Sequence, residues 1–219
     1  MEHASVMNAQ RRRWLKRLSW ATALPLGMGM GMDMLTGCDQ WSQWFAPEGF
    51  RGLDITGADW GAGFDLPDAQ GQQRTLADFG GQVVQLYFGF TQCPDVCPTA
   101  LTRAAEVKRL LGADGQRFRV VMITVDPERD TPELLRAYMA AFDPSFMALR
   151  PATPEQLKAV AQHFRIFYKA VPTGSSYTMD HSAQSYLFDP QGRLRLMLRH
   201  AQPAEDYVHD VRMLLKGST

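Results

Sequence analysis

The sequence predicts a single α/β domain with a mixed central sheet and helices on both of its faces. Two near-continuous apolar runs, 82–90 and 119–125, are typical of strands buried on both faces of a sheet. Stretches with helical spacing of apolar residues alternate with these runs along the chain. With 219 residues, 45% of them hydrophobic, the chain can bury one ordinary core and is short for two.

Each element follows from a local pattern. In chain order we expect a short hairpin turning at 68–71, a strand at 82–90, a helix at 98–111, a strand at 119–125, two helices that begin after Thr131 and Thr153, strands at 185–189 and 194–198, and a closing helix containing Tyr207, Val211, Leu214 and Leu215. Thr131 and Thr153 are each followed by proline, which is favoured at the first helical position, and T-P-E-Q after residue 152 is a capping box. This order fits a thioredoxin-like topology with a mixed sheet.

The first 37 residues are expected to be a signal peptide of the lipoprotein type. A basic run, R-R-R-W-L-K-R, precedes an uncharged stretch, 18–32, that is too short and too rich in glycine for a comfortable membrane span. Leu35-Thr36-Gly37-Cys38 resembles the lipobox of bacterial lipoproteins, which implies acylation of Cys38. Asp39 resembles the signal that keeps such proteins on the inner membrane. We therefore expect an exported protein, lipid-anchored at Cys38 on the periplasmic face of the inner membrane.

The rest of the chain divides into a tether and one domain. Residues 38–60 are rich in Trp, Phe, Gly and Pro without a helical or strand period, which indicates a tether, and the domain is expected at 61–219. Residues 38–219 carry 18 basic and 21 acidic residues, a net charge of −3. No basic excess attracts a phosphate backbone, so nucleic acid is excluded as an expected partner.

The segment Y-F-G-F-T-Q-C-P-D-V-C-P-T places Cys93 and Cys97 between a buried strand and a helix. Because Pro98 disfavours helix at the residue before it, Cys97 is expected at about the N-cap, where the helix dipole stabilises a thiolate. A thiolate attacks disulfides and binds soft metals. Cys93 and Cys97 could form a structural disulfide or share an ion, although a disulfide here would close a very short loop.

A third ligand for such an ion would be a histidine. His163 and His209 fall in predicted helices, and His3 would leave with the signal peptide. His181 lies before a predicted strand and is free to approach the cysteines, so the residues favour it over His200, although a lone histidine is more often structural than a ligand.

Three segments stand out together: F-G-F-T-Q-C-P-D-V-C-P, V-D-P-E-R-D-T-P-E at 125–133 and M-D-H-S at 179–182. They resemble the signatures of the Sco/SenC family, copper proteins of cytochrome c oxidase assembly. The resemblance runs from about residue 50 to 215 and implies a thioredoxin-like fold with copper, Cu(I) or Cu(II), on Cys93, Cys97 and His181. Asp126 and Asp180 would then orient the ligands from outside the first shell, or else be a loop cap and a solvated side chain.

Two functions follow from the resemblance. The first is a metallochaperone that takes copper from a donor protein and delivers it to the dinuclear copper centre of cytochrome c oxidase subunit II. The alternative is a thiol-disulfide reductase, with Cys93 and Cys97 as its redox-active pair, that keeps the cysteines of that centre reduced. The sequence does not separate them, and whether the protein is an enzyme stays open.

Overall fold

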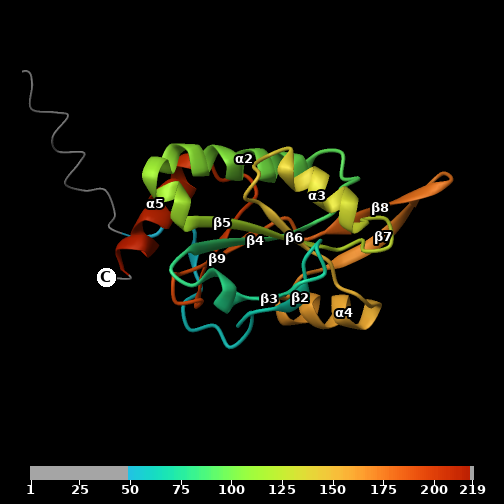
Figure 1. Cartoon of the computed structure of the whole chain (residues 1–219), viewed down its shortest axis with the longest axis horizontal. Helices are drawn as coiled ribbons and strands as arrows, with labels where there is room; N and C mark the ends of the chain where they lie inside the picture. The colour runs from blue at the N-terminus through green and yellow to red at the C-terminus, as the bar shows by residue number, and fades with distance from the viewer. Residues whose placement is uncertain (1–48, 218–219) are drawn as a thin grey trace, which may run out of the picture. The chain divides into compact units, whose positions relative to one another are not determined.

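The computed structural model describes residues 49–217. Its main sheet has six strands in the order β1-β10-β9-β4-β5-β6 (Figure 1). The strands are β1 Leu53–Asp54, β4 Val83–Gly89, β5 Phe118–Thr124, β6 Met147–Leu149, β9 Ser185–Phe188 and β10 Leu194–Leu198. β4, β5 and β6 run parallel, whereas β9 and β10 pair antiparallel with their neighbours. The predicted mixed sheet is therefore confirmed.

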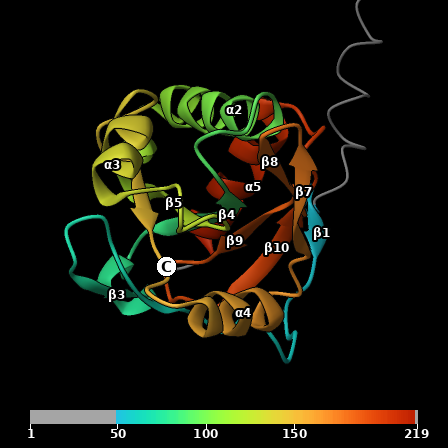
Figure 2. The same ribbon diagram turned by 90° about the vertical axis from the view of Figure 1, so that its right-hand side faces the viewer.

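Helices cover both faces of this sheet. They are α2 Val96–Leu111, α3 Pro132–Ala140, α4 Pro154–His163 and α5 Ala204–Lys216, with 3-10 helices η1 Leu76–Phe79 and η2 Gly112–Arg117. In Figure 2, α2 lies on one side of the sheet and α4 on the other, and α5 packs beside α2. All seven residues of β4 are buried, as the apolar run predicts, and α2 begins directly beyond the loop that follows this strand.

The predicted helix starts are largely confirmed. The hydroxyls of Thr131 and Thr153 accept hydrogen bonds from the backbone N–H groups of Leu134 and Gln156. The capping box at Thr153 is only half formed, because the Gln156 side chain accepts from the N–H of Ala152 instead. The expected hairpin is also present as β2 Asp65–Pro67 and β3 Gln73–Thr75.

The sequence did not predict a second hairpin, formed by β7 Tyr168–Thr173 and β8 Ser176–His181. Figure 1 shows it projecting from the body of the domain. Residues 169–176 are exposed, so the segment lacks the apolar alternation by which half-buried strands are found. His181 therefore ends a strand, whereas we expected it to lie in irregular chain before one.

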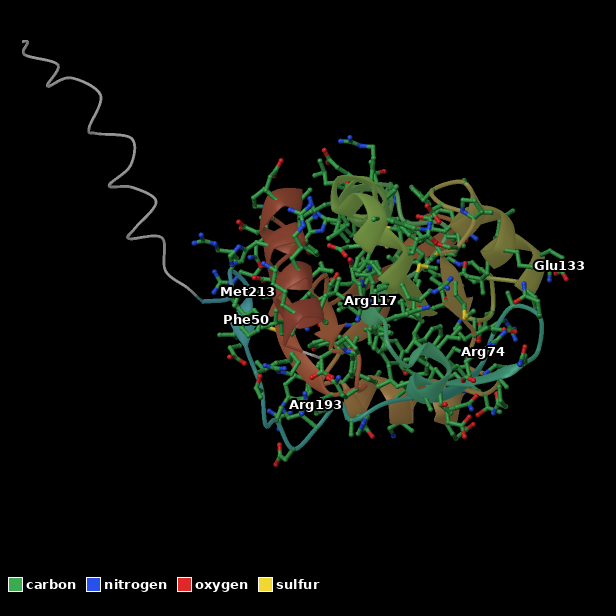
Figure 3. All side chains as sticks on the ribbon, turned by 60° about the vertical axis from the view of Figure 1, so that its left-hand side comes forward. Phe50, Arg74, Arg117, Glu133, Arg193 and Met213 are labelled. Atoms are coloured by element: carbon green, nitrogen blue, oxygen red, sulfur yellow. The ribbon has the colours of Figure 1, made fainter. Side chains whose placement is uncertain are left out.

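Residues 49–60, assigned to a tether from the sequence, contribute β1 to the main sheet. The described part of the domain therefore includes residues 49–60, which lie before the expected boundary at residue 61. The carboxylate of Asp210 on α5 fixes this segment by accepting the N–H groups of Arg51 and Gly52, each at 2.8 Å, and Figure 3 shows Phe50 close to α5. The expected signal peptide and Cys38 lie outside the described residues. Within residues 49–217, no helix has the length and apolar character needed to cross a membrane.

Replacing Asp210 by alanine should release this segment from α5. Two N–H groups lose their acceptor, so we expect a loss of about 1–3 kcal/mol in the free energy of unfolding. Urea denaturation of Asp210→Ala measures it, and Asp210→Asn, which keeps only one of the two acceptor oxygens, should show a smaller loss. Equal stability of wild type and Asp210→Ala would contradict this role.

Candidate metal centre

The two cysteines lie at the junction of β4 and α2. Cys97 is in the first turn of α2, which begins at Val96, so the expected N-cap position of Cys97 is wrong by two residues. Pro98 is tolerated there because the N–H groups of the first turn have no partner within the helix. The backbone N–H of Cys97 donates instead to the sulfur of Cys93, 3.4 Å away. Cys93 thus supplies the acceptor that a capping side chain normally offers.

Hydrogen bonds to the sulfur of Cys93 lower the pKa of its thiol to about 4. The main cause is a hydrogen bond from the Cys97 thiol, and His181 and the N–H groups of Asp95 and Cys97 add to it. Conversely, the pKa of Cys97 is raised, because its proton bonds to the Cys93 sulfur and its side chain is buried. The thiolate that the sequence analysis placed on Cys97 is therefore on Cys93 in the metal-free dithiol.

The sulfur of Cys97 is enclosed by β4. A Cβ atom at Gly89 would lie 3.1 Å from this sulfur and 2.7 Å from the ring of Tyr87, so glycine is what lets the helix approach the strand so closely. The Tyr87 hydroxyl donates to Cys97 Sγ at 3.5 Å. Sequence reasoning missed Tyr87 because it lies within a continuous apolar run. Both cysteines are free, so the alternative of a structural disulfide is not what this structure holds.

His181 brings its Nε2 to 3.5 Å from Cys97 Sγ. Its other nitrogen, Nδ1, lies 2.9 Å from the carbonyl oxygen of Ser182. Because a carbonyl can only accept, Nδ1 carries the proton that it donates to Ser182, and Nε2 is the nitrogen that faces the sulfurs. The ring stands edge-on to Phe90 and Tyr87, at centroid distances of 5.7 and 6.2 Å.

The ligand atoms of Cys93, Cys97 and His181 all lie within 4.8 Å of one another. With bonds of about 2.3 Å to sulfur and 2.0 Å to nitrogen, as for zinc, a three-coordinate ion needs donors roughly 3.5–4 Å apart. Two thiolates and an imidazole form a soft donor set suited to copper. Among the described residues, no second group of three such side chains comes together. His209 bonds the carbonyl of Gly49 instead, and His163 stands edge-on to the ring of Phe164.

The two acidic residues that were expected to orient the cysteines and His181 have different surroundings. Asp126 is buried and binds Arg129 and Tyr177, so it meets the strand that carries His181 but bonds none of the three ligands directly. Asp180 is exposed, and alternation along β8 directs it away from the face of His181. The orienting contact that we expected from Asp180 is made by the Ser182 carbonyl.

Asp130, which the sequence analysis did not single out, supports the cysteine loop. Its carboxylate accepts the hydroxyls of Thr91 at 2.6 Å and Thr124 at 2.5 Å, and it also accepts the N–H of Thr91. Burial raises the pKa of this fully buried carboxyl. The carboxylate therefore ties the start of the cysteine loop to the end of β5. The only sequence feature that could have indicated a role for Asp130 was its place in the segment D-P-E-R-D.

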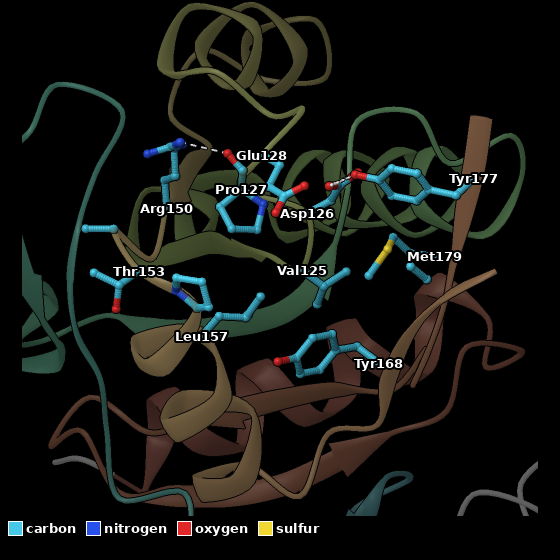
Figure 4. A pocket seen from close by; sticks show the side chains of 13 residues that line it. Val125, Asp126, Pro127, Glu128, Arg150, Thr153, Leu157, Tyr168, Tyr177 and Met179 are labelled. Carbon is cyan, nitrogen blue, oxygen red and sulfur yellow. Dashed lines mark hydrogen bonds between the residues drawn. The ribbon is translucent and has the colours of Figure 1, made fainter. Parts of the chain in front are cut away.

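A cavity of about 480 Å³ lies beside the hairpin (Figure 4). Tyr168, Tyr177 and Met179 of the hairpin face Val125 and Asp126 across it. Tyr177, Met179 and His181 alternate along β8, so the wall of this cavity and the His181 side chain belong to one face of the strand.

These features define a class of protein: a thioredoxin-like domain with a Cys-Cys-His cluster at the strand–helix junction. The chain belongs to the SCO1/SenC family, whose model matches residues 54–216. It is 37% identical over 198 residues to the mouse mitochondrial protein SCO2 homolog, covering 87% of this chain and 75% of that protein. A SCO2-like protein of Rickettsia felis is 37% identical over 136 residues, covering 61% of this chain and 66% of that protein.

Solved structures agree with this assignment and with the predicted fold class. Bradyrhizobium japonicum ScoI, determined with copper bound, matches with a TM-score of 0.64 and 37% identity over 72% of this chain and 99% of that one. Yeast Sco1 with copper bound matches with a TM-score of 0.65 and 30% identity over 73% of this chain and 90% of that one.

In the reduced, metal-free protein, iodoacetamide should modify Cys93 much faster than Cys97. Cys93 has a pKa of about 4 and is 9% exposed, whereas Cys97 is fully buried. Labelling of Cys93 should persist at pH 6 and fall only near pH 4, because the thiolate is the nucleophile. Peptide mapping across pH measures this. Equal labelling of both cysteines, or a midpoint near the ordinary value of about 8.5, would contradict the assignment.

Proposed function

We propose that this domain is a copper metallochaperone. It would bind one copper ion, as Cu(I) or Cu(II), through Cys93 Sγ, Cys97 Sγ and His181 Nε2. It would receive the ion from a copper donor protein and deliver it to the dinuclear copper centre of cytochrome c oxidase subunit II. The convergence of the three donor atoms is the observation that carries the proposal, and copper-bound relatives in the same family support it.

The chemistry of the cluster fits a transferable ion. Three protein donors leave a coordination position open, which an incoming ligand can occupy before any of the three lets go. Cys93 is already a thiolate, so the ion displaces a proton from the Cys97 thiol alone. Copper is thus the cargo of the domain, and the site holds it with soft donors in a partly buried place.

A thiol-disulfide reductase is the second candidate, and the low pKa of Cys93 favours it. The Cys93 thiolate would attack a disulfide in the partner, forming a mixed disulfide and releasing one partner thiolate. Cys97, after losing its proton, would then attack Cys93 Sγ and release the second partner thiolate. The partner gains two electrons, and the domain ends with a Cys93–Cys97 disulfide. His181 is not required for this reaction.

Substitution of each ligand tests the first proposal. Cys93→Ser, Cys97→Ser and His181→Ala should each weaken copper binding by more than the roughly 10–100-fold typical of residues outside the first shell. Competition with a chromogenic copper chelator under anaerobic conditions gives the affinities. His209→Ala, whose imidazole bonds the Gly49 carbonyl, is the matched control and should bind copper as wild type does.

The same His181→Ala variant separates the two functions. If the protein is a copper carrier, His181→Ala should abolish oxidase assembly. If it is a reductase, His181→Ala should still support oxidase assembly, because its two cysteines are intact. Copper affinity that is unchanged in all three ligand variants would refute the metallochaperone. Full oxidase assembly by His181→Ala would favour the reductase.

We further propose that the chain is held by acyl groups at Cys38 on the periplasmic face of the inner membrane. The resemblance of Leu35–Cys38 to a lipobox and the basic, then uncharged segment before it support this location. The domain would then work close to the membrane-bound oxidase.

Labelled palmitate should be incorporated into the wild-type chain, and the mature protein should begin at Cys38. Cys38→Ala removes the acceptor thiol, so no label should be incorporated. Mass spectrometry of the membrane-extracted protein gives the new N-terminus and the added acyl mass. Cys97→Ser is the matched cysteine control and should be labelled normally; equal labelling of Cys38→Ala would exclude the anchor.

A further inference from the structure

His181 reaches the sulfurs from a hairpin that packs on the domain through only part of its length. β7 and β8 pair only with each other, and residues 169–176 are exposed. A two-stranded ribbon of this kind is marginally stable alone. The position of the imidazole therefore depends on what fixes the hairpin to the body.

Tyr177 is bound to the body through three of its groups. Its hydroxyl donates to Asp126 Oδ1 at 2.9 Å, as Figure 4 shows, and its backbone carbonyl accepts from Arg129 Nη1 at 2.6 Å. The guanidinium of Arg129 also lies 3.6 Å from the centroid of the Tyr177 ring, in a cation–π contact. Arg129 Nε donates to the other oxygen of Asp126, so each of the three residues contacts the other two. We refer to Asp126, Arg129 and Tyr177 as the latch.

The latch acts on the same strand and the same face as the metal ligand. Tyr177 and His181 are four residues apart on β8, a span of about 13 Å at 3.3 Å per residue. Arg129 also reaches the ligand by a second route, because its guanidinium lies 6.0 Å from the ring centroid of Phe90, and Phe90 stands edge-on to the His181 ring.

The cost of the latch also indicates a role beyond stability. Arg129 is largely buried, and its Nη2 has no hydrogen-bond partner among the described residues. Burying an arginine with one donor unpaired is an inefficient way to stabilise a fold, because an apolar side chain avoids the desolvation cost. The planar fork does, however, bind Asp126 and the Tyr177 carbonyl in one fixed geometry.

We propose that Arg129 is a positioning residue, which acts with Asp126 and Tyr177 to hold the β7–β8 hairpin, and hence the imidazole of His181, over the two sulfurs. This inference rests on the proposed copper site. When the latch is released, the hairpin carries His181 away, whereas the cysteine loop keeps its own support from Asp130. The latch therefore governs copper binding and leaves the dithiol unchanged.

A double-mutant cycle tests the proposal. Copper affinity is measured by chelator competition for wild type, Arg129→Gln, His181→Ala and the double variant. Arg129→Gln should weaken binding about tenfold when His181 is present and have no effect within about twofold when it is absent. The pH profile of Cys93 alkylation should be unchanged in Arg129→Gln, and amide exchange in β7 and β8 should accelerate.

Two further variants keep the test decisive. Tyr177→Phe removes only the hydroxyl contact and should cause a smaller loss, about two- to threefold, that also disappears in the His181→Ala background. Arg212→Gln, on α5 with one bond to the Leu110 carbonyl, is the matched arginine control. Equal losses with and without His181, or no loss for Arg129→Gln, would overturn the latch. If His181→Ala itself leaves copper affinity unchanged, the proposed ligand set fails, and the latch fails with it.

Discussion

The contact between His181 Nε2 and Cys97 Sγ joins parts of the chain that are 84 residues apart, and the architecture around it serves to make it possible. One side is rigid, because Cys97 is buried between β4 and α2 where Gly89 leaves room for its sulfur. The other side is a hairpin that projects from the domain (Figure 1). A rigid pair of sulfurs thus meets an imidazole whose position depends on separate contacts.

The segment D-P-E-R-D divides its charged residues between these two sides. Asp130 binds Thr91 and Thr124 and so supports the cysteine loop, whereas Asp126 and Arg129 bind Tyr177 on the hairpin. A single loop after β5 therefore fixes both halves of the cluster. Because Arg129 neutralises Asp126, this ion pair adds no net charge next to two sulfurs that are to carry negative charge.

The sequence was sufficient for the parts of the molecule whose patterns are local. Buried strands, helix caps at Thr131 and Thr153, and the cysteine pair were all visible as spacing or residue type. The β7–β8 hairpin was not visible, because its exposed residues lack an apolar period. The thiolate was assigned to the wrong cysteine, since a dipole argument cannot show that Cys93 Sγ receives the N–H of Cys97. Contacts between segments far apart in the chain, such as that of Arg129 with Tyr177, cannot be predicted from the spacing of residues within either segment.

In the proposed copper site, the unequal attachment of the three ligands would set the order in which they release the ion. Two sulfurs fixed on one turn of chain can hold an ion by themselves while the imidazole leaves with the hairpin, so release need not break all three bonds together. As a ligand the imidazole is neutral, because Nδ1 keeps the proton that it donates to the Ser182 carbonyl, and its departure therefore separates no charge. An acceptor that supplies its own imidazole or thiolate can then enter at the vacated position. A cluster whose three donors all came from the strand–helix junction would lack this separately held ligand and the stepwise release that it permits.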